Sequence, residues 1–112
     1  MEKLYEIEII EEAISWVKLD KKVVMATVIS TWGSSPFGIG TKMIINEEGD
    51  FFGSVSGGCV EANVIEESIK LLKNKYSFKK LEFNVLDENA WDLGLACGGN
   101  ISVFIEKINK WK

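Results

Sequence analysis

The sequence has 112 residues, two cysteines and no histidine, with a net charge of −4, 46% hydrophobic residues and 27% charged residues. This size and composition are typical of one soluble domain with a single modest core. The acidic balance argues against a nucleic-acid partner, which needs a basic stripe. The longest near-apolar run, Val23–Ile29, is far shorter than the ~20 residues of a membrane span. Because the acidic N-terminus does not resemble a signal peptide, we expect a cytoplasmic protein with reduced cysteines.

Hydrophobic periodicity predicts two helices, over Leu4–Leu19 and Val60–Lys75, each with acidic residues early and lysines late, as the helix dipole favours. Val23–Thr31 is almost continuously apolar and β-branched, so we expect a central strand that is buried on both faces. Thr41–Asn46 and Phe51–Val55 have strand patterns and flank a short turn, Glu47–Asp50, in which Gly49 is placed for positive φ, so we expect a β-hairpin. Lys80–Val85 and Asn100–Ile108 also have strand patterns. The order of elements predicts one domain over residues 1–112, of α+β or α/β class, with a single mixed sheet of about five strands and two main flanking helices.

Three glycine-rich corners interrupt these elements, and both cysteines lie in them. The corners are Gly33-Ser34-Ser35, Ser56-Gly57-Gly58-Cys59 and Cys97-Gly98-Gly99. Glycines allow the backbone to approach a ligand closely and to point successive N–H groups at an anion, and the second corner also opens a helix. A phosphate or another oxyanion is therefore one interpretation, and three tight turns is the other. Neither GxxxxGK[ST] nor GxGxxG is present, so neither nucleotide motif supports a site here.

The cysteines allow several chemistries. A helix start favours the thiolate form of Cys59, whereas the nearby Glu61 opposes it, and a small buried apolar role is the alternative. Two thiols without histidine cannot close a tetrahedral zinc site, but they could hold one soft metal position or form a redox pair if Cys59 and Cys97 meet. Lys42, in a strand beside the serine loop, could face an anion or simply be an exposed sheet lysine.

Four motifs taken together resemble the N-terminal domain of the XdhC/CoxI family. They are Thr27–Pro36 (TVISTWGSSP), Gly40–Met43 (GTKM), Gly53–Glu61 (GSVSGGCVE) and Gly94–Gly99 (GLACGG). The motifs stand in the family's order, and the resemblance covers residues 8–108.

The resemblance implies an accessory chaperone for molybdenum hydroxylases such as xanthine dehydrogenase and carbon monoxide dehydrogenase. Such a protein binds the molybdenum cofactor (molybdopterin) transiently, protects it while its terminal sulfido ligand is installed, and passes it to the apo-enzyme. The implied partners are the apo molybdenum hydroxylase, a cysteine desulfurase and a second copy in a homodimer. We expect the protein itself to be non-catalytic, so no catalytic residue is assigned.

The glycine corners and their neighbours then become the candidate contacts to the cofactor. These residues are Gly33, Ser34, Ser35, Lys42, Ser56, Gly57, Gly58, Cys59, Glu61, Cys97, Gly98 and Gly99. The thiols of Cys59 and Cys97 are the candidate contacts to molybdenum through the cofactor.

Two features depart from the family pattern. Phe37 stands where members usually carry a basic residue, so an anion contact there is in doubt. The longer members add a C-terminal Rossmann-like domain, which we expect to be absent here; a separate subunit could supply it. Two alternative functions remain open: a thiol-based sulfur carrier or transferase in which Cys59 receives persulfide sulfur, and a dimerising subunit that recruits a separate Rossmann-domain partner.

Overall fold

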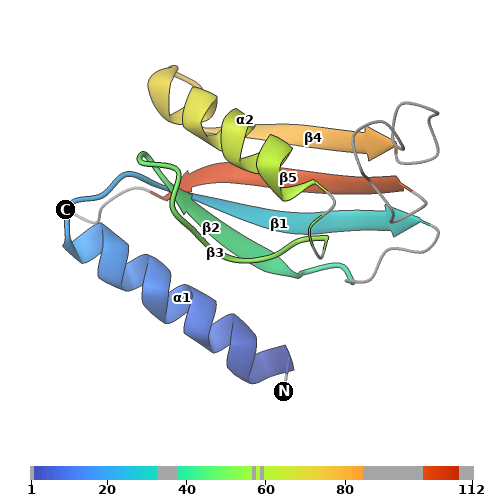
Figure 1. Cartoon of the computed structure of the whole chain (residues 1–112), viewed down its shortest axis with the longest axis horizontal. Helices are drawn as coiled ribbons and strands as arrows, with labels where there is room; N and C mark the ends of the chain where they lie inside the picture. Colours follow the sequence, from blue (N-terminus) through green and yellow to red (C-terminus); the bar gives the residue numbers. More distant parts are fainter. Residues whose placement is uncertain (1, 33–37, 57, 59, 85–99, 109–112) are drawn as a thin grey trace.

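The computed structural model describes residues 2–32, 38–56, 58, 60–84 and 100–108 (Figure 1). Two helices and five strands follow one another as α1 (Glu2–Lys18), β1 (Val23–Trp32), β2 (Lys42–Asn46), β3 (Phe51–Gly53), α2 (Glu61–Lys73), β4 (Phe78–Asn84) and β5 (Asn100–Ile108). The strands form one sheet in the order β3-β2-β1-β5-β4. The predicted α+β class, the five strands and the two flanking helices are confirmed. All four described pairings are antiparallel, so the sheet shows none of the parallel pairing that a mixed sheet would contain.

β1 is the central strand, as predicted from its run of β-branched residues. It pairs with β2 along one edge and with β5 along the other. Side chains alternate between the two faces of a strand, so Val24 and Val28 enter the core beneath α2 while Val23 enters the core beneath α1. Both faces of β1 are therefore covered near its start, which explains why this part of its sequence lacks polar alternation. The expectation of burial on both faces over Val23–Thr31 is wrong for the later part of the strand, where Ile29 and Ser30 are exposed.

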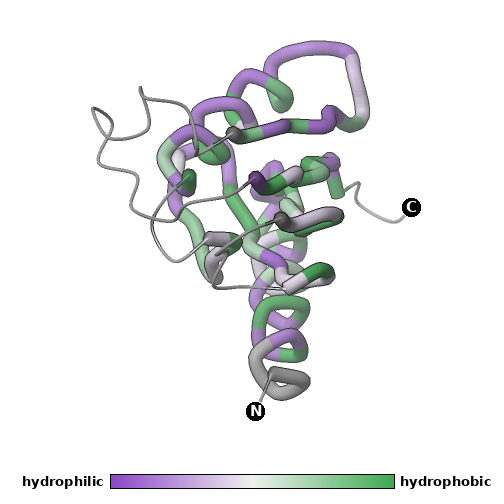
Figure 2. The backbone as a smooth tube through the Cα atoms, turned by 90° about the vertical axis from the view of Figure 1, so that its right-hand side faces the viewer, coloured by the Kyte–Doolittle hydropathy of each residue, from purple (hydrophilic) through white to green (hydrophobic). Residues whose placement is uncertain are grey.

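The two helices lie on opposite faces of the sheet. α1 packs Ile9 and Ala13 against Val23 and Ile44 of the β1–β2 side. α2 packs against the larger core, which includes strands β1, β2, β4 and β5, and it contributes Val64 among other residues. Figure 2 looks at the sheet from the end at which β1 finishes and shows hydrophilic and hydrophobic stretches mixed along both helices. Neither helix of the described ranges is both long and apolar enough to cross a membrane.

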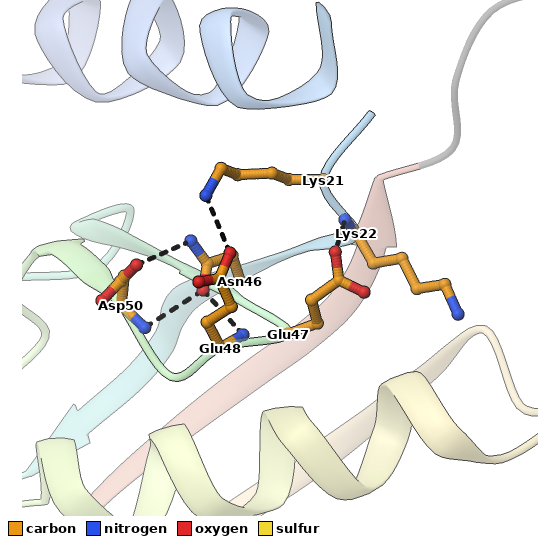
Figure 3. Close-up of polar contacts among 6 residues, drawn as sticks. All are labelled: Lys21, Lys22, Asn46, Glu47, Glu48 and Asp50. Carbon is orange, nitrogen blue, oxygen red and sulfur yellow. Dashed lines mark hydrogen bonds and ion pairs between the residues drawn. The ribbon is translucent and has the colours of Figure 1, made fainter. Parts of the chain in front are cut away.

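A tight turn joins β2 to β3 at the end of the sheet where β1 begins (Figure 3). The buried Asn46 side chain accepts hydrogen bonds from the backbone N–H groups of Glu48 at 2.9 Å and Asp50 at 3.1 Å. Gly49 adopts φ +87°, as the predicted turn requires. An ion pair of 2.9 Å between Lys21 and Glu48 attaches the turn to the α1–β1 connection. This end of the sheet is thus held by a dense set of local contacts.

Candidate functional site

The strand ends that carry the sequence motifs meet at the other end of the sheet, which we call the motif end. Trp32, the last residue of β1, pairs with Asn100, the first of β5, and Asn100 also pairs with Asn84 at the end of β4. β2 starts and β3 finishes toward this end as well, since Lys42 pairs with Thr27 and Met43 pairs with Gly53, although β1 continues beyond that pairing to Trp32. In Figure 1 the tips of β1 and β4 and the start of β5 lie on the right, and α2 begins at its end nearer to them.

The chain topology therefore attaches all three predicted corners to the motif end. The first corner follows Trp32 directly and the third directly precedes Asn100, and these two anchor residues are paired across the sheet. The corner residues Gly33, Ser34, Ser35, Gly57, Cys59, Cys97, Gly98 and Gly99 themselves lie outside the described residues. Of the predicted site, the structure describes Lys42, Ser56, Gly58 and Glu61.

Glu61 is the centre of the described part of the site. Its side chain is buried, and its carboxylate accepts hydrogen bonds from six donors among the described residues of the loop between β3 and α2. Oε2 accepts the Ser54 hydroxyl and the N–H groups of Val55 and Ser56, the last two at 2.9 Å. Oε1 accepts the Ser56 hydroxyl and the N–H groups of Gly58 at 2.9 Å and Val60 at 3.3 Å.

The local sequence explains this geometry. Val60 is the N-cap of α2, and its side chain makes no capping hydrogen bond. Glu61 is the first helical residue, and its carboxylate folds back over the preceding loop, where it accepts N–H groups of the described loop residues up to and including Val60. The Ser56 hydroxyl, which donates to Glu61, also accepts the Val60 N–H at 2.9 Å. Gly58 adopts φ +109°, a conformation that favours glycine, so the chain can turn beneath the carboxylate.

The loop keeps Glu61 ionised despite its burial. Burial by itself raises the pKa of a carboxyl, but hydrogen bonds from the Ser54 and Ser56 hydroxyls and from the Ser56 and Val55 N–H groups outweigh it and lower the pKa of Glu61 from 4.5 to about 2. No lysine of the described ranges forms an ion pair with this carboxylate. The dipoles of the loop and the helix start therefore balance the charge.

Lys42 lies at the motif end but on a different face. Met43 and Ile45 of β2 belong to the core beneath α2, whereas Ile44 belongs to the core beneath α1, so strand alternation places Lys42 on the α1 face. Its ammonium group donates to the Gly40 carbonyl at 3.0 Å. The structure thus brings Ser56, Gly58 and Glu61 together and leaves Lys42 apart from them.

Sequence reasoning did not select Ser54, although its hydroxyl is one of the donors to Glu61. The signal that could have found it is the pair of serines placed seven and five residues before an acidic residue at a predicted helix start. Such a contact depends on the path of the loop, which hydrophobic periodicity does not report.

A separate cleft of about 380 Å³ lies at the opposite end of the sheet, where α1 finishes and β1 begins. Its lining residues are Val17, Asp20, Lys21, Lys22, Val23, Leu72, Lys107 and Ile108. None of the four predicted site residues that the structure describes lines it, so the motif end remains the candidate site.

Comparisons with known proteins agree with the resemblance seen in the motifs. Residues 16–84 match the model of the XdhC and CoxI family. Over 101 residues the chain is 30% identical to the molybdenum cofactor insertion chaperone PaoD of Escherichia coli (strain K12), a match that spans 89% of this chain and 31% of that protein. It is also 30% identical to a protein of Bacillus subtilis (strain 168) named as a probable xanthine dehydrogenase subunit, over 82% of this chain and 28% of that protein.

A solved structure has the same fold. The crystal structure of a xanthine dehydrogenase from Bacillus halodurans superposes with a TM-score of 0.76 at 30% identity, covering 89% of this chain and 30% of that chain. The chain therefore spans about a third of the length of the relatives that it matches. Because the family model covers more than half of its residues, the chain belongs to the XdhC and CoxI family.

Proposed function

We propose that this chain is an accessory chaperone that binds the molybdenum cofactor and assists its insertion into a molybdenum hydroxylase of the xanthine dehydrogenase type. The observation that carries the proposal is the attachment of all three glycine-rich corners, through the paired residues Trp32 and Asn100 and the start of α2, to one end of the sheet. The names of the relatives, one a molybdenum cofactor insertion chaperone, support it.

The chemistry of the corners fits the two ends of a molybdopterin. Glycine-rich backbone with adjacent hydroxyls suits a phosphate, so we assign the phosphate contact to Gly33, Ser34 and Ser35. Thiolates are soft ligands suited to a metal–dithiolene group, so we assign that contact to Cys59 and Cys97. The bound cofactor would supply the redox chemistry of the target enzyme, whereas the residues of this chain hold it and shield it from water.

Release must follow binding, because a chaperone passes its cargo on. In the described ranges the motif end offers one lysine, Lys42, and its ammonium group is already bonded to a carbonyl. Recognition by neutral N–H and O–H donors and by two thiols gives moderate affinity compared with a cluster of lysines or arginines. We further propose that sulfuration by a cysteine desulfurase takes place while this chain holds the cofactor, and that the chain works as a homodimer.

The test is cofactor retention by the purified full chain. Cofactor released from a molybdoenzyme is incubated with the wild type, with Cys59→Ala, with Cys97→Ala and with Glu48→Ala as a control at the opposite end of the sheet. We expect pterin and molybdenum to co-elute with the wild type and the control, and retention to fall at least about tenfold in each cysteine variant. Absence of co-elution with the wild type, or full retention by both cysteine variants, would overturn the proposal.

A further inference from the structure

The six donors around Glu61 make a site of the kind that binds an oxyanion. Four backbone N–H groups and two hydroxyls converge on one point at the start of a 13-residue helix. Each carboxylate oxygen accepts three hydrogen bonds from the described loop residues, which exceeds the roughly two lone pairs of each oxygen. No donor of this set is left over for a second anion.

We propose that Glu61 is the resident anion of this corner: its carboxylate fills the site that an external phosphate would otherwise take, and it sets the backbone on both sides of Cys59. Gly58 and Val60, which flank Cys59 in the sequence, both donate their N–H groups to Oε1 of Glu61. Glu61 is then a positioning residue for the cysteine corner and not a contact to the cofactor.

Charge and geometry both exclude an external phosphate from this corner. An incoming phosphate would meet a carboxylate that stays ionised at neutral pH, and like charges at short distance repel strongly in a buried site. To make room, the Glu61 side chain would have to leave six hydrogen bonds at once. A phosphate contact of the proposed cofactor is therefore expected at another corner. This inference concerns the loop itself and holds whether or not the chain binds the cofactor.

Chemical rescue tests the resident anion directly. Glu61→Ala removes a CH₂–COO⁻ group, and acetate supplies nearly the same atoms. Thermal unfolding is followed by circular dichroism in sodium acetate and in sodium chloride at equal ionic strength and pH 7. We expect Glu61→Ala to lower the Tm by about 10 °C or more in chloride, and acetate to restore a saturable part of that loss.

Two control variants separate rescue from general effects. Val64→Ala, in the core beneath α2, loses stability without creating an anion site, and Glu66→Ala removes an exposed carboxylate from the same helix. Neither variant should respond to acetate more than to chloride. If Glu61→Ala is unfolded in chloride, recovery of the folded signal on adding acetate is the readout.

A second readout tests the positioning of Cys59. The measured quantity is the rate at which iodoacetamide alkylates Cys59, relative to the rate for Cys97 in the same chain. We expect this ratio to change severalfold in Glu61→Ala and to return toward the wild-type value in acetate. In Val64→Ala, under folding conditions, the ratio should stay unchanged. Equal effects of acetate and chloride on Glu61→Ala would overturn the inference. So would a rise in wild-type Tm with inorganic phosphate that Ser56→Ala abolishes, since it would show that the corner accepts an external anion with Glu61 in place.

Discussion

Acidification should destabilise this fold through one buried carboxylate. The pKa of Glu61 is about 2 in the folded chain against an ordinary value of 4.5, so the folded state holds the ionised form more favourably than the unfolded state does. A depressed folded pKa gives stability that is complete above pH 4.5 and is lost as the pH falls toward 2. The difference between the two pKa values corresponds to about 3 kcal/mol at neutral pH, of which about 2 kcal/mol is lost by pH 3.

The measurement is urea unfolding of the wild type and of Glu61→Gln at pH 7, 5, 4 and 3. Glutamine keeps the shape but loses the charge, and its NH₂ group faces donors of the loop, so we expect a loss of about 3 kcal/mol at pH 7. Hydrogen bonds from Lys79 and Lys70 also lower the pKa of Glu67. Glu67 is present in both proteins, so its effect cancels in the free-energy difference between wild type and Glu61→Gln.

The free-energy difference between wild type and Glu61→Gln should therefore shrink by about 2 kcal/mol between pH 7 and pH 3. Glu66→Gln, an exposed position on α2, should track the wild type within about 0.5 kcal/mol throughout. A wild-type-to-glutamine difference that stays constant across this pH range would refute the reasoning, because the charge of Glu61 would then contribute nothing to stability.

Four further substitutions test other parts of the fold by urea unfolding. Gly53→Ala should cost about 3 kcal/mol of stability, since Gly53 has φ +92° and an added Cβ would lie 2.7 Å from the Lys42 carbonyl oxygen. Gly40→Ala, at φ +94° with open space around it, should cost only about 1 kcal/mol. Equal losses in the two variants would contradict the steric explanation. Asn46→Ala should cost about 2 kcal/mol because two turn N–H groups lose their acceptor, and a loss under 0.5 kcal/mol would show that water replaces it. Ser68→Ala should raise stability by about 0.5–1 kcal/mol, because the buried Ser68 hydroxyl has no hydrogen-bond partner in the described part of the chain and alanine is the better helix former; a loss would reveal a partner.

Features with a local cause were predictable from the sequence. The strand over the β-branched run of β1 and the turn around Gly49 depend mainly on neighbouring residues, and the structure confirms both. The antiparallel β2–β3 hairpin is also confirmed. The direction of the other three described pairings was not predictable, because apolar alternation does not identify the partner strand. The boundaries also moved: β3 ends at Gly53, where the positive φ redirects the chain, and not at Val55.

The internal roles of the glycine-rich corner before α2 were not predictable from the sequence. Glycines before a helix start indicated an anion-binding corner, and the structure shows that the Glu61 carboxylate of this chain receives the donors. The separation of Lys42 from that corner could be derived from strand alternation only after the face covered by α2 was known. Both results depend on tertiary arrangement, which a single sequence does not state directly.

The position of β5 in the sheet also affects how the protein folds as it is synthesised. β5 is synthesised after the other four described strands, yet it lies between β1 and β4, and its Ile108 pairs with Val23 at the start of β1. The β2–β3 hairpin and α1 can form early, whereas β4 has no described partner strand except β5. Such long-range pairing slows folding and leaves the edge of β1 open to other chains until synthesis passes Ile108. A chain that stops before Asn100 would therefore contain β1, β2 and β3 on one side and β4 on the other, without the strand that joins them.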